Sequence, residues 1–180
     1  LLSLLLTTKP IERKELIVEM LCHHTDKDVA DSLINLLEQH PGNFAFRESA
    51  AWALASLDIV RARKYFHIGK LDILVAEDEP DIRELITFSL RFSGWTVTGT
   101  SNGFGAYAFT QVYEPDLVLL DVRMPKMTGY DACRLIKSNP FTKHIPVVFL
   151  SAKGQDNEIL TGLDAGAEEY LLKPFAPDQL

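Results

Sequence analysis

Four short apolar runs in the second part of the chain each end on polar side chains that could do chemistry. Carboxylates follow two of these runs, at Glu77 and Asp78 and again at Asp121. A hydroxyl follows the next run at Ser151, and an ammonium follows the last one at Lys173. If the runs are parallel strands, their carboxyl ends share one edge of a sheet, and ligands bind at that edge in open α/β folds. The sequence therefore predicts that three carboxylates, a hydroxyl and an ammonium converge.

The run before Asp121 shows why these segments are interpreted as strands. Leu117 to Leu120 are all aliphatic, which is too short for a buried helix but suits a central parallel strand that is apolar on both faces. Pro125 and Gly129 follow and stop the segment from continuing. Asp121 is therefore expected at the carboxyl end of a strand, facing a loop. Taken alone, an Asp in this position is more often a helix cap or a turn residue.

The chemistry of this set favours a divalent cation over a directly bound phosphate. A phosphate-binding loop is usually rich in glycine, whereas Glu77-Asp78-Glu79 is acidic and would repel an anion. Hard carboxylate oxygens are the ligands that Mg²⁺ takes, together with water and phosphate oxygens. Without a cation, carboxylates this close would raise one another's pKa values. The set thus predicts a Mg²⁺ site.

The elements that must position these groups follow from a change in periodicity along the chain. From residue 71, short β-rich runs alternate with helical patterns, which indicates a doubly wound parallel α/β sheet. The expected strands are 71–76, 96–100, 117–120, 146–150 and 170–172. The expected helices are 81–92, 103–113, 130–138 and 157–165, and residues 176–180 are interpreted as the first turn of a further helix.

Residues 1–68 show helical periodicity and are expected to form a separate all-α segment. One predicted helix runs from 45 to 57, and 60–67 is interpreted as another that leads into the first strand through a short hinge at 68–70. The Ala-rich stretch within 28–57 weakly resembles a HEAT-type helical repeat. An unrelated small bundle is the open alternative, because repeats need several stacked units.

Composition and charge limit the functions of the chain. Residues 1–70 have no net charge, so residues 71–180 contribute the entire net charge of −7. An acidic segment without a basic cluster argues against direct nucleic-acid binding by this fragment. The apolar start, Leu1 to Leu6, is far shorter than the roughly 20 residues that span a bilayer.

The first residues and the two cysteines indicate where in the cell the protein is expected. The start lacks the basic residues of a signal peptide, and without an initiator Met the chain is interpreted as part of a longer protein. Cys22 and Cys133 show no metal-binding spacing and are expected as buried thiols in a reducing cytoplasm.

Residues 72–180 closely resemble the receiver domain of two-component response regulators. The matching motifs occur in the family's order and at its spacing. They are 73–80 (ILVAEDEP), 115–129 (PDLVLLDVRMPKMTG), 145–152 (IPVVFLSA) and 166–175 (GAEEYLLKPF). The resemblance implies a (βα)5 flavodoxin-like fold with strand order 2-1-3-4-5, here lacking its last helix, over 71–180.

The resemblance also implies a role for each polar side chain. Asp121 would accept a phosphoryl group, and Glu77, Asp78, Asp121 and the backbone carbonyl of Arg123 would hold Mg²⁺. Lys173 would pair with the phosphoryl oxygens, and Ser151 would reorient to hydrogen-bond them. Tyr170 would be the aromatic switch that follows Ser151, although a half-buried packing aromatic is the simpler reading of a Tyr. The Lys173–Pro174 peptide bond would be cis.

The partners implied by the resemblance are a histidine kinase or phosphotransfer protein and a second copy of the chain. The second copy would pair through the face made by the fourth helix, the fifth strand and the missing fifth helix. The helical segment 1–68 is expected to bind another protein, and no membrane contact is expected.

Three other functions are alternatives to a phosphorylated receiver. A haloacid-dehalogenase-type phosphatase needs a second Asp two residues after the nucleophile, where this chain has Arg123, which cannot donate a proton at neutral pH. A flavodoxin needs a Ser/Thr/Gly-rich loop in place of Glu77-Asp78-Glu79. A degenerate receiver that acts only as a protein-interaction module remains the alternative, and a phosphorylation assay discriminates it.

Overall fold

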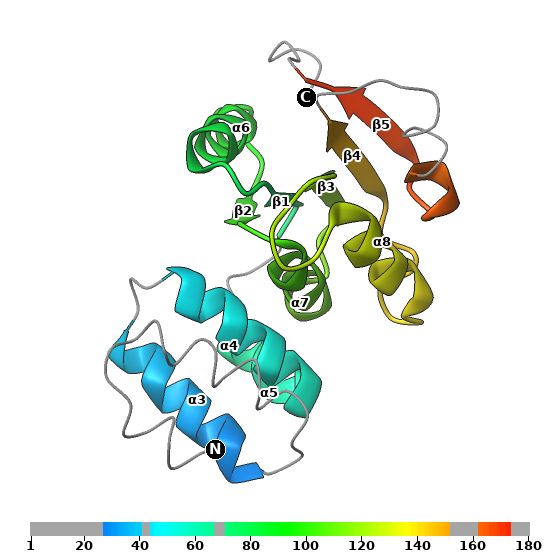
Figure 1. The fold of residues 1–180 in the computed structure, drawn as a ribbon. Helices are drawn as coiled ribbons and strands as arrows, with labels where there is room; N and C mark the ends of the chain where they lie inside the picture. The colour runs from blue at the N-terminus through cyan, green and yellow to red at the C-terminus, as the bar shows by residue number, and fades with distance from the viewer. Residues whose placement is uncertain (1–26, 41–43, 67–70, 152–161, 174–180) are drawn as a thin grey trace. The chain divides into compact units, whose positions relative to one another are not determined.

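The computed structural model describes residues 27–40, 44–66, 71–151 and 162–173 (Figure 1). The chain divides into two compact units, residues 1–67 and 68–180, and each is described by itself. Several expectations from the sequence lie outside the described residues. They concern part of the helix 157–165, the first helical turn at 176–180, the buried thiol of Cys22 and the cis peptide bond before Pro174.

The first unit contains three described helices, α3 (Lys27–Gln39), α4 (Phe44–Leu57) and α5 (Ile59–Tyr65). Its core is aliphatic and aromatic, and the fully buried side chains include Leu33, Leu37, Phe46 and Leu54. Asp58 ends the connection between α4 and α5 and caps α5, since its carboxylate accepts the backbone N–H of Arg61 at 3.0 Å.

The second unit is a five-stranded parallel sheet in the order β2-β1-β3-β4-β5. The fold class and strand order predicted from the sequence are therefore confirmed. β2 lies on one side of β1, and β3, β4 and β5 follow one another on the other side. The strands are β1 (Ile73–Ala76), β2 (Val97–Thr100), β3 (Leu117–Asp121), β4 (Val147–Ser151) and β5 (Glu169–Leu172).

Helices cover both faces of this sheet. Figure 1 shows α6 (Pro80–Phe92) on one face, with α7 (Gly103–Tyr113) and α8 (Gly129–Ser138) side by side on the other. The α6 face buries a cluster in which Ile86 and Leu90 of the helix pack on strand residues such as Ile73, Val75 and Leu119. All four residues of β1 are buried, which explains why the central strands lack polar alternation.

Within the ranges that the structure describes, no helix combines the length and apolar character that crossing a bilayer demands.

Candidate functional site

Three carboxylates meet where β1 and β3 end. Glu77 and Asp78 follow β1, and Asp121 is the last residue of the neighbouring strand β3. One ligand oxygen from each of the three lies within 4.8 Å of the other two. Glu77 and Asp121 are buried, whereas Asp78 is exposed. We call these three residues the carboxylate cluster.

The ammonium of Lys173 lies between the two buried members of the cluster. Its Nζ donates to Asp121 Oδ1 at 2.6 Å and also to Glu77 Oε2. Lys173 follows β5, whose residue Leu172 pairs with Ser151 of β4, so the register of four adjacent strands, β1, β3, β4 and β5, brings the contact together. The cluster therefore has a counterion supplied by its own chain.

Burial and charge set the protonation of this group. Burial raises the pKa of Glu77 above its usual value, and the hydrogen bond from Lys173 reduces that rise without cancelling it. Burial by itself would lower the pKa of Lys173, but its bonds to Asp121 and Glu77 outweigh this and raise the pKa. Lys173 is thus a cation at neutral pH, which suits it to anionic oxygens.

Backbone groups orient Asp121. Its Oδ2 accepts the backbone N–H of Arg123 at 2.7 Å, so both carboxylate oxygens are held, one by the main chain and one by Lys173. Gly129, at the start of α8, lies against the same residue. A Cβ there would overlap the carbonyl oxygen of Asp121 and would lie 3.0 Å from its carbonyl carbon. A side chain at residue 129 would therefore displace the end of β3.

Ser151 and Tyr170 lie next to this region without joining the carboxylate cluster. Ser151 ends β4, directly after Leu150, which pairs with Asp121, and it is buried. The half-buried ring of Tyr170 packs against Phe149 with 6.0 Å between ring centroids. Its hydroxyl oxygen is buried and has no hydrogen-bond partner within the described part of the chain. A buried polar group without a partner costs roughly 1–3 kcal/mol.

Two residues of this region were not anticipated from the sequence. Arg83 of α6 donates from Nη1 to the backbone carbonyls of Glu77, at 2.5 Å, and of Asp78, at 3.3 Å. Gly99 of β2 leaves the space in which the side chain of Arg83 lies. An arginine six residues after a carboxylate and a glycine inside a strand were the available signals, but neither is specific.

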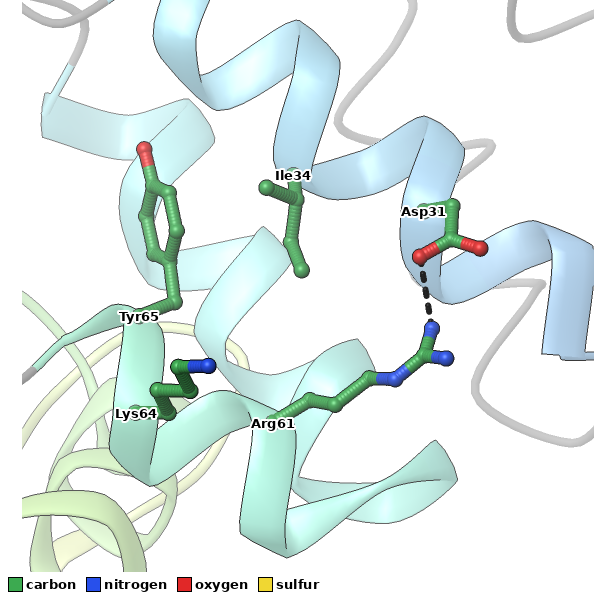
Figure 2. A pocket seen from close by; sticks show the side chains of 5 residues that line it. All are labelled: Asp31, Ile34, Arg61, Lys64 and Tyr65. Carbon is green, nitrogen blue, oxygen red and sulfur yellow. Dashed lines mark hydrogen bonds and ion pairs between the residues drawn. The ribbon is translucent and has the colours of Figure 1, made fainter.

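The first unit has a cleft of about 430 Å³ of its own, shown in Figure 2. Side chains of α3 and α5 line it: Asp31, Ile34, Arg61, Lys64 and Tyr65. The guanidinium of Arg61 is neutralised by Asp31, at 2.6 Å, and by Asp58, at 3.3 Å. This cation is therefore engaged within the unit, and the pair serves to join α3 to α5.

Cys133 is buried in α8 and belongs to the core, not to the site. Its Sγ donates to the carbonyl of Ala165 at 3.4 Å, and burial raises the pKa of the thiol to about 11. At pH 8 the thiol is therefore almost entirely protonated and little of it is the reactive thiolate.

We expect native Cys133 to resist 5,5′-dithiobis(2-nitrobenzoate) at pH 8, because the thiol is both buried and protonated. A Cys22→Ser variant isolates its signal, and the same protein in urea provides the fully reactive reference. Native labelling as fast as labelling in urea would contradict the assignment.

Comparison with known proteins shows which family the second unit resembles. The model of the response regulator receiver domain family matches residues 73–180. The DNA-binding response regulator MtrA of Mycolicibacterium smegmatis is 37% identical over 108 residues, which are 60% of this chain and 46% of MtrA. The phosphate regulon regulator PhoB of Pseudomonas aeruginosa is 37% identical over 113 residues, 63% of this chain and 49% of PhoB. The chain thus spans about half the length of these relatives.

Solved structures show the same fold. The receiver domain of the sensor histidine kinase PA1611 of Pseudomonas aeruginosa, with a magnesium ion coordinated in its active-site cleft, is 31% identical with a TM-score of 0.58. That similarity covers 62% of this chain and 91% of the other. The chemotaxis protein CheY4 of Vibrio cholerae is 27% identical, also with a TM-score of 0.58, over 61% of this chain and 92% of the other. The family model begins at residue 73, so it gives no support to the HEAT-like interpretation of 28–57.

Proposed function

Because this chain belongs to the response regulator receiver domain family of two-component phosphorelay signalling, we propose that Asp121 is its phosphoacceptor. The donor would be a phosphohistidine on a histidine kinase or phosphotransfer protein. The observation that carries the proposal is the buried Asp121 carboxylate, held between the ammonium of Lys173 and the N–H of Arg123 and next to Glu77 and Asp78.

The carboxylate cluster fits a magnesium ion. Its donors are hard oxygens from three residues, and at least one of them, on Asp78, is exposed and accessible to a hydrated ion. We infer that Asp78 and Asp121 hold Mg²⁺ together with the backbone carbonyl of Arg123, and that Glu77 contributes partly through water. When bound, Mg²⁺ would neutralise charge on the phosphoryl oxygens.

Phosphoryl transfer to a carboxylate depends mainly on alignment and charge neutralisation. An oxygen of Asp121 forms the new P–O bond while the P–N bond of the phosphohistidine breaks, and the histidine nitrogen keeps the bonding electron pair. Lys173 stays protonated and passes from a carboxylate to a phosphoryl oxygen. Receiver domains generally act as phosphoacceptors and not as enzymes with a separate substrate; assistance by this chain in its own phosphorylation and dephosphorylation is part of the proposal.

Ser151 and Tyr170 would transmit the change. Ser151 ends β4, one residue after Leu150, which pairs with Asp121, and its hydroxyl would turn to donate to a phosphoryl oxygen. Tyr170 packs on the same strand, and its hydroxyl has no hydrogen-bond partner among the described residues, so its rotation would break no hydrogen bond to them. Leu172 in β5 and Leu163 shortly before that strand are both exposed, and exposed apolar side chains near β5 suit pairing with a second copy or another protein. The first unit would contribute a separate protein contact.

Phosphorylation by acetyl phosphate tests the proposed function. We expect wild-type protein incubated with acetyl phosphate and Mg²⁺ to gain one phosphoryl group by intact mass. Peptide mapping should place the acid-labile adduct on the segment that contains Asp121, and excess EDTA should prevent it. An unmodified wild-type protein would instead favour a degenerate receiver that acts only through protein contacts.

A further inference from the structure

Arg83 links helix α6 to the backbone that carries two of the three cluster carboxylates. Its Nη1 donates to the carbonyl oxygens of Glu77, at 2.5 Å, and Asp78, at 3.3 Å. The next segment begins α6 itself, whose first residue is Pro80. Arg83 thus reaches back over the turn that connects β1 to its own helix and ties down two successive peptide groups. Fixing these carbonyls also fixes the directions in which the Glu77 and Asp78 side chains leave the backbone.

Gly99 of β2 provides the space for this contact. A Cβ at residue 99 would lie 3.1 Å from Cδ and 3.2 Å from Cγ of Arg83, and 3.5 Å from Cγ2 of Thr87. The aliphatic part of Arg83 therefore lies directly on the backbone of β2 at Gly99, the residue that pairs with Val75 of β1. A glycine inside a strand weakens the strand and often marks such a close approach.

Two other bonds hold the same turn, and both involve Glu77, whereas the bond from Arg83 also reaches Asp78. The N–H of Glu77 donates to the carbonyl of Thr100 at 3.0 Å, which continues the pairing with β2. The N–H of Glu79 lies 3.4 Å from Oε1 of Glu77. Asp78 is exposed, and the hydrogen bond that its carbonyl accepts from Arg83 is exposed as well.

Arg91, two helical turns later on α6, gives the matched comparison. Its Nε and Nη2 donate to the carbonyl of Val97, at 3.2 and 2.7 Å. Val97 is the first residue of β2, at the opposite end of that strand from the turn that carries the carboxylates. Both arginines attach α6 to the edge of the sheet, but only Arg83 touches residues of the carboxylate cluster.

We propose that Arg83, seated over Gly99, is a positioning residue that sets the geometry of the Glu77–Asp78 cation site. The inference rests on the proposed function, because it concerns the Mg²⁺ that this function requires. Residues that orient metal ligands typically change metal affinity 10- to 100-fold when they are replaced. Arg83→Met keeps the aliphatic contact with β2 but removes both hydrogen bonds, so we expect the Kd for Mg²⁺ to rise about tenfold.

Calorimetric titration of the full chain with Mg²⁺ measures the Kd, and urea unfolding of the metal-free protein measures stability. Together they separate an effect on the geometry of the cation site from a general loss of stability. Arg91→Met should lower stability by an amount similar to Arg83→Met but change the Kd less than about twofold, because its contact is remote from the cluster. Arg83→Lys retains a donor and should recover part of the affinity. Gly99→Ala should push Arg83 aside and weaken Mg²⁺ binding, and adding it to Arg83→Met should cause little further loss.

The outcomes distinguish this inference from the proposed function. A wild-type protein that binds no Mg²⁺ would overturn both. Wild-type binding together with an unchanged Kd in Arg83→Met would overturn the positioning role alone, as would equal losses of affinity in Arg83→Met and Arg91→Met. If Arg83→Met does not fold, Gly99→Ala decides: a folded variant with wild-type affinity overturns the inference, and weakened binding supports it.

Discussion

Replacing Asp121 with Asn is expected to abolish phosphoryl uptake from acetyl phosphate while the protein stays folded. The amide has nearly the same shape as the carboxylate but lacks the negative oxygen that attacks phosphorus. One amide oxygen can satisfy either Lys173 or the N–H of Arg123, and the amide nitrogen then faces the other donor. The loss of one such bond costs about 1–3 kcal/mol, and removing one of three clustered carboxylates offsets part of it.

Asp116→Asn is the matched control for this experiment. It makes the same chemical change immediately before β3, at the opposite end of the strand from Asp121, where the side chain is exposed. Intact mass after a fixed incubation with acetyl phosphate and Mg²⁺ should show an adduct on wild type and on Asp116→Asn but not on Asp121→Asn. An adduct of wild-type abundance on Asp121→Asn, with circular dichroism unchanged, would show that another residue accepts the phosphoryl group.

The sequence predicted the sheet well because each of its signals is local. Leu117 to Leu120 are buried or half-buried in a central strand, as four aliphatic residues in a row indicate. Gly94 and Gly166 adopt positive φ in the turns before β2 and β5, where glycine is the residue that costs least. Parallel strands joined by helices then permit few topologies, since crossovers are right-handed.

The convergence of the polar groups could be predicted, but their pairing could not. Strand ends at one edge of the sheet explain why Glu77, Asp78 and Asp121 come together, and this required only the order of elements. Which carboxylates the Lys173 ammonium contacts depends on how β1, β3, β4 and β5 are aligned with one another in the sheet. No short sequence pattern contains that alignment. The sequence predicts the Lys173 ammonium at the same edge as the carboxylates, but it does not identify Glu77 and Asp121 as the two that the ammonium contacts.

Contacts between an element and a distant backbone were missed for the same reason. Gly129 was recognised as a residue that interrupts a strand, whereas the structure shows that it admits the carbonyl of Asp121. Arg83 has the sequence signature of an ordinary helical surface arginine. Its role depends on the absence of a side chain at Gly99, a residue on another strand. Such pairs become visible only when both partners have coordinates.

Replacing Lys173 with Met is expected to lower the free energy of unfolding by about 3–5 kcal/mol at neutral pH, because it leaves buried carboxylates without their counterion. The Glu77 side chain is only 2% exposed and that of Asp121 11%. Methionine fills a similar volume, so the loss would reflect charge more than packing. Phosphoryl uptake should fall as well, since the ammonium that would meet the phosphoryl oxygens is gone.

The pH dependence identifies the cause of this loss. Burial already raises the pKa of Glu77, and without Lys173 the pKa should rise further. An acid whose pKa is higher in the folded state than in the unfolded state stabilises the fold as pH falls through that range, because the folded state binds the proton more tightly. The stability deficit of Lys173→Met should therefore shrink as the pH is lowered from neutrality toward 4.5, the usual pKa of Glu77. Lys173 itself has a raised pKa, so in wild type its contribution is fully present below its usual pKa of 10.5 and is lost only above it.

Lys137→Met separates a buried counterion from an ordinary ion pair. Lys137 bonds to Glu168 at 2.6 Å, but that carboxylate is 49% exposed and water can solvate it when the lysine is removed. Its loss should cost about 1 kcal/mol for the ion pair, plus the bond to the carbonyl of Ile145 at 2.8 Å, and should depend little on pH near neutrality. Urea unfolding at several pH values compares both variants with wild type. A Lys173→Met deficit no larger than that of Lys137→Met, or one that grows as the pH falls, would show that the ammonium does not serve as the counterion of Glu77 and Asp121.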